Sequence, residues 1–262
     1  MTRIVDDNNW KQFVDMGKSA GRLCGAIPRE KDGRKPLSVG RPLTDDMPLI
    51  PESEWHDRIK YMTENKLWIA DRVAKAGGDD PNQHYQNGLG YCWAYSLSQA
   101  VEAERIRMGL DFQLLAPESL GEDVRWRNAG NYLDSAIQYA AKYGIARRLY
   151  VPQHEINPDR FDSQWKDDRA NFVPLEWWDL SGRDVWAQTV TALLSGFGCY
   201  VGLDWWSHAV WYGKLVLDGN KIGVWTPNSH GPREDVILFG SKAVPSMDSY
   251  VARSVTYSPL AA

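Results

Sequence analysis

The segment from Gln86 to Ser96 constrains the fold most, because it places a cysteine where a polar loop turns into a helix. Apolar residues recur at the helical period after this cysteine: Trp93, Leu97, Ala100 and Val101. Charged residues lie between them and are expected to face water: Glu102, Glu104, Arg105 and Arg107. The pattern predicts an amphipathic helix that begins at Cys92 and stops at Gly109.

Cys92 at this position is a candidate nucleophile. The first turn of a helix carries about half a positive charge, which stabilises a thiolate, the reactive form of cysteine. Gln86, six residues upstream, offers a side-chain amide that can donate to an oxyanion. The alternative is an inert cysteine in a core helix, which is the better interpretation of an isolated Cys-Trp-Ala. A catalytic interpretation therefore needs a base elsewhere in the chain.

A base and a group to orient it occur nearer the C-terminus. His208 opens a run rich in β-branched and aromatic residues, and Asn228 ends the next such run. Asp218-Gly219-Asn220 separates the two runs, and Asp-Gly between apolar stretches is a strong hairpin signal. Antiparallel pairing would bring His208 and Asn228 together, so that the asparagine orients an imidazole that exchanges a proton with Cys92.

These residues resemble the pattern of the papain family of cysteine peptidases. The family's motifs are a glutamine, then Cys-Trp-Ala-aromatic-Ser, later His-Ala-Val, and finally Asn-Ser-Trp-Gly. Here they fall on Gln86, Cys92-Trp93-Ala94-Tyr95-Ser96, His208-Ala209-Val210 and Asn228-Ser229-His230-Gly231. The order and the six-residue spacing from glutamine to cysteine both match, and the similarity extends from about Ile50 to the end of the chain.

The resemblance implies an α+β fold with a helical lobe, an antiparallel sheet or open barrel lobe, and a cleft between them. It implies peptide-bond hydrolysis through an acyl-enzyme, with Cys92 as nucleophile, His208 as acid and base, Asn228 as orienting group and Gln86 in the oxyanion hole. No cofactor is required. Gly130 marks the loop that would hold a peptide or protein substrate as an added strand, and Trp206 is expected near the cleft.

Several departures from the family pattern bear on these expectations. His230 replaces the tryptophan that shields the Asn-His hydrogen bond, and it also competes with His208 as a candidate base. Leu89 stands where secreted members have a disulfide cysteine. Cys199 is interpreted as a buried strand residue from its apolar neighbours, and Cys24, which has no motif around it, is interpreted as inert. We expect no metal site, because the cysteines and histidines lack the close spacing of zinc ligands.

Composition and charge limit the classes of partner and the cellular compartment that we expect for this chain. The 262 residues carry a net charge of -4, which offers no general basic field for nucleic acid. The N-terminus lacks the apolar core of a signal peptide, and no run of about 18 apolar residues suggests a membrane span. Only three cysteines are present, so no disulfide framework is expected. We therefore expect a cytoplasmic protein that does not bind membranes.

The chain divides into an N-terminal arm over residues 1–50 and a catalytic domain over 51–262. The helical lobe is expected over about 51–180 and the β lobe over about 181–262. The arm could act as an inhibitory plug. Alternatively, it could dock onto a protein partner, and the chain would then be a papain-like structural component of a larger assembly, such as a viral particle, with weak or no proteolytic activity.

Overall fold

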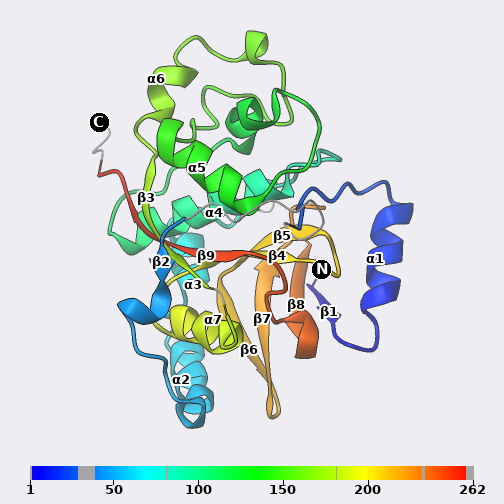
Figure 1. The fold of residues 1–262 in the computed structure, drawn as a ribbon, viewed down its shortest axis with the longest axis vertical. Coiled ribbons are helices and arrows are strands. Elements are labelled where there is room, and N and C mark those ends of the chain that lie inside the picture. The colour runs from blue at the N-terminus through cyan, green and yellow to red at the C-terminus, as the bar shows by residue number, and fades with distance from the viewer. Residues whose placement is uncertain (1, 29–38, 81, 181, 232–233, 258–262) are drawn as a thin grey trace.

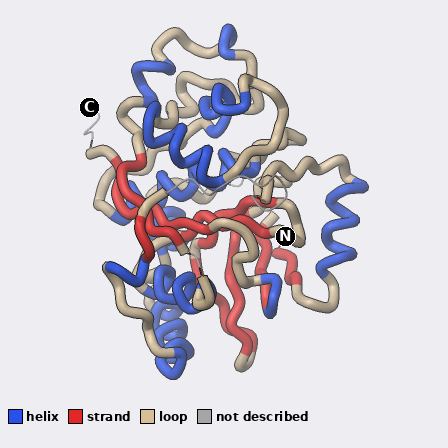
Figure 2. The backbone as a smooth tube through the Cα atoms, viewed as in Figure 1, coloured by secondary structure: helices blue, strands red, loops and turns tan. Residues whose placement is uncertain are grey.

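The computed structural model describes residues 2–28, 39–80, 82–180, 182–231 and 234–257. Within them the chain forms a helical part and a part built on two β-sheets, and the long helix α4 (Cys92–Arg107) lies between the two parts (Figure 1). Figure 2 shows most of the strands gathered on one side of this helix. This is the mixed α and β architecture that the resemblance implies.

Seven α-helices lie in the described ranges. They are α1 (Trp10–Ser19), α2 (Glu52–Glu64), α3 (Ile69–Lys75), α4, α5 (Leu133–Tyr143), α6 (Trp165–Arg169) and α7 (Val185–Leu194). The stretch from residue 52 to 76, whose apolar pattern suggests a single helix, forms two, because the chain turns between Asn65 and Trp68 with a left-handed φ of 52° at Lys66. None of the helices in the described ranges is long and apolar enough to span a bilayer.

The strands form two separate sheets, so the described residues do not close into a barrel. They are β1 (Thr2–Val5), β2 (Arg41–Pro42), β3 (Pro174–Asp179), β4 (Cys199–Leu203), β5 (His208–Tyr212), β6 (Lys214–Asp218), β7 (Lys221–Pro227), β8 (Asp235–Phe239) and β9 (Ser249–Val255). One sheet has the order β1-β8-β7-β6 and the other β2-β3-β9-β4-β5. The edge pairs β1–β8 and β2–β3 are parallel, and the other pairs are antiparallel.

The hairpin predicted at Asp218-Gly219-Asn220 is confirmed, but its first strand is shorter than expected. β6 and β7 pair antiparallel from Asp218 opposite Lys221 to Lys214 opposite Trp225. The run that starts at His208 is interrupted at Gly213, where the chain leaves one sheet for the other. His208 therefore lies in β5, which pairs with β4, and it faces Leu203 across that ladder.

Helix α4 is buried on all sides, and this corrects the expectation of a water-exposed face. Every residue from Cys92 to Ile106 is buried, including three that were expected to face water: Glu102, Glu104 and Arg105. Glu102 accepts a hydrogen bond from the Leu115 amide and lies 2.8 Å from His84 Nε2, so His84 is not the solvated loop residue that its polar neighbours suggest. Glu104 pairs with Arg107 at 2.7 Å. Buried charges persist where such partners satisfy them.

The N-terminal arm is attached to the β part at its first strand. β1 pairs in parallel with β8, from Thr2 opposite Asp235 to Val5 opposite Leu238. Figure 1 shows α1 standing at the side of the molecule, beyond β1 and β8. Phe13 of this helix packs edge-on against Trp206, with ring centroids 4.8 Å apart. The chain that follows α1 then passes toward the N-terminus of α4.

Candidate active site

Cys92 lies at the N-terminus of α4, where the sequence places it. The helix has no side-chain cap, so its first amides are available to a negative charge. The sulfur accepts hydrogen bonds from the amides of Gly25 (3.2 Å) and Ala209 (3.4 Å), and the residue is completely buried. Ala209 follows His208, so the two motifs meet at the sulfur. Burial raises the pKa of the Cys92 thiol, even though the backbone hydrogen bonds lower it.

The His208 imidazole is buried against His230 and close to Asn228. Neither ring nitrogen has a hydrogen bond of good geometry within the described residues. Burial lowers the pKa of His208 well below its usual value, the neighbouring His230 lowers it further, and the proximity of Asn228 acts in the opposite direction. Burial therefore disfavours the charged forms of both the thiol and the imidazole.

Asn228 is directed toward Glu234 as well as toward His208. Its Nδ2 donates to Glu234 at 3.0 Å, and its Oδ1 accepts from the amide of His230 at 3.2 Å. Glu234 in turn forms an ion pair with Arg22 at 2.7 Å. Asn228 is therefore linked through the buried carboxylate of Glu234 to Arg22 in the N-terminal arm, and no motif in the sequence signals this connection.

His230 and Trp206 cover the His208 ring. The His230 ring lies 4.0 Å from the His208 ring between centroids, and the Trp206 ring lies 4.5 Å away, each tilted by about 40°. Two aromatic side chains thus pack against the His208 ring. Trp206 is itself buried between His208 and Phe13, and His230 has a pKa lowered to about 4 by its own burial and by Arg22.

Gln86 has its side-chain amide directed into the same site. Its Nε2 donates to the carbonyl oxygen of Leu23 at 2.8 Å and also to Leu89, while its Oε1 accepts from Ser229. The backbone amide of Gln86 donates to the Ser229 carbonyl oxygen at 2.8 Å. The loop that carries Gln86 is therefore hydrogen-bonded to Ser229, the residue after Asn228. The Nε2 donor of Gln86 is occupied by the carbonyl oxygens of Leu23 and Leu89.

Residues 22–27 occupy the cleft between the helical part and the sheets. The Asn131 amide donates to Gly25 O (2.8 Å), and the Ile27 amide donates to Asn131 O (3.1 Å), so that Ala26 and Asn131 form a parallel bridge. On the other side, the Ala26 amide donates to Ser207 O at 3.2 Å. The segment is therefore hydrogen-bonded on both sides, to Asn131 in the helical part and to Ser207 between β4 and β5.

Gly130 permits the close approach of this segment. A Cβ at Gly130 would stand 2.5 Å from the carbonyl oxygen of Gly25, and a Cβ at Gly25 would stand 1.8 Å from the carbonyl oxygen of Gly90. Side chains at either position would separate the two backbones. The predicted substrate-binding glycine thus contacts the chain's own arm.

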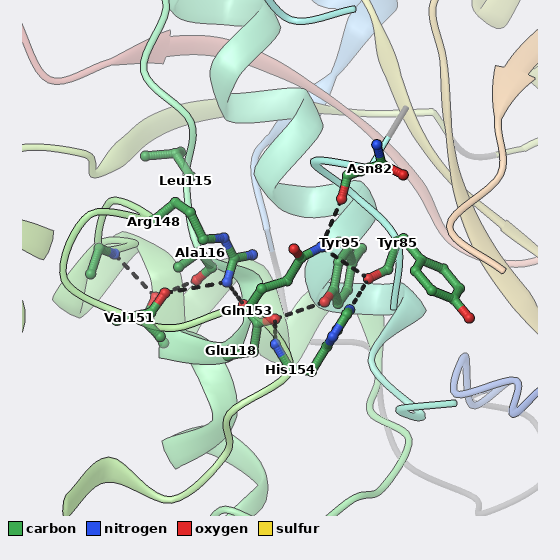
Figure 3. A network of polar contacts seen from close by, with 12 residues as sticks. Asn82, Tyr85, Tyr95, Leu115, Ala116, Glu118, Arg148, Val151, Gln153 and His154 are labelled. Carbon is green, nitrogen blue, oxygen red and sulfur yellow. Dashed lines mark hydrogen bonds and ion pairs between the residues drawn. The ribbon is translucent and has the colours of Figure 1, made fainter. Parts of the chain in front are cut away.

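A buried polar network supports the loop before Gln86 (Figure 3). Glu118, which is fully buried, pairs with Arg148 at 2.7 Å and accepts from the Tyr95 hydroxyl (2.7 Å) and the His154 amide (2.8 Å). His154 Nε2 lies 2.6 Å from the carbonyl oxygen of Tyr85, the residue next to Gln86. The network therefore connects the body of the helical part to the loop that positions the Gln86 amide.

One residue interpreted as inert lies in the site. Cys24 Sγ is 3.8 Å from His230 Nε2, although no motif surrounds Cys24 in the sequence. All three cysteines are free thiols, and Cys199 is buried in β4 as predicted. Proximity to His230 arises from folding of the arm into the cleft, which the local sequence around Cys24 does not signal.

Three solved structures with a similar architecture are pro forms of proteases. No family model and no curated protein matches the sequence. Digestive procathepsin L 3 of the Tenebrio molitor larval midgut is similar with a TM-score of 0.56 and 14% identity, over 94% of this chain and 79% of that one. For proCathepsin B S9 from Trypanosoma congolense the values are 0.53 and 12%, over 90% and 87%.

The third structure is the ragweed pollen allergen Amb a 11, a cysteine protease in its proform. It is similar with a TM-score of 0.51 and 16% identity, over 66% of this chain and 61% of that one. At these identities the similarity concerns architecture alone. The chain has the fold of the papain-like cysteine proteases.

Proposed function

We propose that this chain is a cysteine peptidase held in a self-inhibited form, with Cys92 as the nucleophile and residues 22–27 as the inhibitory segment. One observation carries the proposal: the Gly25 amide donates a hydrogen bond to the Cys92 sulfur, and the Leu23 carbonyl oxygen accepts one from Gln86 Nε2. The segment occupies both the nucleophile and the expected oxyanion donor.

The segment is not in a position to be cleaved. The Cys92 sulfur contacts an N–H group of the segment, and an N–H group is a proton donor rather than an electrophile. Burial raises the pKa of Cys92 and lowers that of His208, so the reactive thiolate and imidazolium are both disfavoured. Release of residues 22–27 would admit water and reverse both effects.

The released site would perform acyl transfer on a peptide or protein substrate. The Cys92 thiolate attacks the carbonyl carbon, and the oxyanion is held by the Gln86 side chain and the Cys92 amide. His208 as imidazolium protonates the leaving amine, then takes a proton from the water that hydrolyses the acyl-enzyme. Asn228 orients the ring, while His230 and Trp206 exclude water from it.

Labelling with a peptide-like electrophile that traps thiols tests the nucleophile. After the segment has been displaced, the electrophile is expected to modify Cys92, and peptide hydrolysis should accompany it. Cys92→Ala should lose both while keeping its fold, measured by circular dichroism. Cys199→Ala is the matched control, because it removes a thiol buried in β4 and should keep both. Hydrolysis that persists in Cys92→Ala would refute the assignment of Cys92 as the nucleophile.

The structural-component alternative predicts a different outcome of the same test. A papain-like body that serves in an assembly, with its arm docked on a protein partner, would show no hydrolysis even with the segment displaced. For either role we propose a reducing compartment such as the cytoplasm, because all three cysteines are unpaired.

A further inference from the structure

Three side chains that bind transition metals converge at the inhibited site. Cys24, His208 and His230 each place one ligand atom within 4.8 Å of the other two, and Cys24 Sγ lies 3.8 Å from His230 Nε2. They come from three distant parts of the chain, which are the arm, the start of β5 and the loop after β7. Sequence spacing could not bring them together, and this is why no metal site was expected.

The donor set suits a thiophilic divalent cation. Zn²⁺ takes thiolate sulfur at about 2.3 Å and imidazole nitrogen at about 2.0–2.1 Å in tetrahedral geometry, which separates a sulfur and a nitrogen by about 3.6 Å. The 3.8 Å separation between Cys24 and His230 is close to that value. The remaining separations between ligand atoms are at most 4.8 Å. Three protein ligands leave a fourth position for water.

The His208 imidazole provides independent support for a ligand. It is fully buried, yet neither of its nitrogens has a hydrogen bond of good geometry. Buried polar atoms without a partner are uncommon, and a bound ion is one of their recognised causes. His230 Nε2, by comparison, has the Leu23 carbonyl at 3.2 Å as a second neighbour. Cys24 keeps solvent access, which gives an ion a path to the site.

We propose that Cys24, His208 and His230 bind a Zn²⁺ ion that clamps the inhibitory segment in the cleft. Cys24 belongs to the segment and the two histidines to the body, so the complete ligand set exists only while the segment is docked. Binding and docking are therefore linked: zinc at 100 times its Kd would multiply the ratio of docked to released segment about 100-fold. The ion would also withhold His208 from proton transfer. The effect on hydrolysis rests on the proposed function, whereas the binding itself does not.

Zinc titration of the full chain, stripped with a chelator and kept reduced with a phosphine, tests the site. Calorimetry and metal analysis should give one Zn²⁺ per chain, and Co²⁺ in its place should produce a thiolate charge-transfer band. Cys24→Ser and His230→Gln should each weaken zinc affinity by at least about 100-fold, since even partners outside the ligand set contribute about 10- to 100-fold. Cys199→Ala and the half-buried His56→Gln are the matched controls and should keep full affinity.

Two results would overturn the proposal. One is the absence of stoichiometric zinc in the unaltered chain. The other is unchanged affinity in Cys24→Ser combined with lost affinity in Cys92→Ala, which would place the ion on the nucleophile instead. In support, zinc should slow Cys92 labelling in the unaltered chain, with reversal by chelator and a smaller effect in Cys24→Ser. The zinc stoichiometry and the Co²⁺ charge-transfer band are measured without hydrolysis. They therefore test the metal site even if the chain proves not to be a peptidase.

Discussion

Gly25→Ala should release the inhibitory segment from the cleft. An alanine Cβ at this position would lie 1.8 Å from the Gly90 carbonyl oxygen and 2.6 Å from its carbon. Real Cβ contacts are not shorter than 3.0 Å, so the two backbones would have to separate by at least 1.2 Å. Both partners are backbone, so neither can rotate away. The segment is the part that can move.

The size of the effect follows from the contacts that such a separation breaks. Gly25 accepts from the Asn131 amide and donates to Cys92 Sγ, and the neighbouring Ile27 and Ala26 amides make two further hydrogen bonds. Each contributes a net 0.5–1.5 kcal/mol, roughly, and water replaces part of this after release. A loss of about 2–3 kcal/mol shifts the balance of docked to released segment by about 30- to 150-fold.

The rate at which iodoacetamide alkylates Cys92 reports the released fraction, because the sulfur is buried while the segment is docked. Peptide mapping separates this modification from that of Cys24. Gly17→Ala is the matched control in the same arm, where the new Cβ would meet only Arg22 Cδ at 3.7 Å. Equal alkylation of Cys92 in Gly25→Ala and Gly17→Ala, with both folded, would refute the reasoning that residues 22–27 bury the nucleophile.

Two further variants test the supports of the site through urea denaturation. Glu118→Gln leaves its half-buried partner Arg148 without a full counter-charge and should lower the free energy of unfolding by about 3–5 kcal/mol. Glu54→Gln, in an exposed pair, should change it by less than about 1 kcal/mol, and similar losses in the two variants would contradict the role of burial. Gly144→Ala combines a left-handed φ of 79° with a Cβ 1.7 Å from the Arg169 carbonyl oxygen, so it should lower the free energy of unfolding by more than about 3 kcal/mol. Gly219→Ala is the control, because φ is 57° there and the space is open, and it should lower the free energy of unfolding by about 1–2 kcal/mol. Equal costs at the two glycines would show that the contact plays no part.

Local signals in the sequence were sufficient for the main elements that carry the site. The start of α4 at Cys92, the hairpin at Asp218-Gly219-Asn220 and helix α7 each follow from periodicity and turn residues within about 20 positions. The ordered motifs, each a few residues long, were enough to indicate the architecture.

Features that depend on distant partners were not predictable in the same way. Glu102 and Glu104 have the sequence pattern of a solvated helix face, yet they are buried. Glu102 is satisfied there by His84 and by the Leu115 amide, which come from other segments of the chain. Cys24 lacks any local motif, and its position beside His230 exists only because the arm folds back into the cleft. Such contacts are properties of tertiary packing rather than of periodicity.

The parallel pairing of β1 with β8 makes the inhibitory segment a tethered ligand. Its attachment at Thr2–Val5 lies 17 residues before Arg22, so a segment that leaves the cleft stays within reach of it. Short tethers of this kind give effective concentrations of roughly millimolar order. A free peptide with the sequence of residues 22–27 would therefore have to be supplied at comparable concentration to occupy the cleft as fully, and each release event would be brief unless β1 also left its sheet.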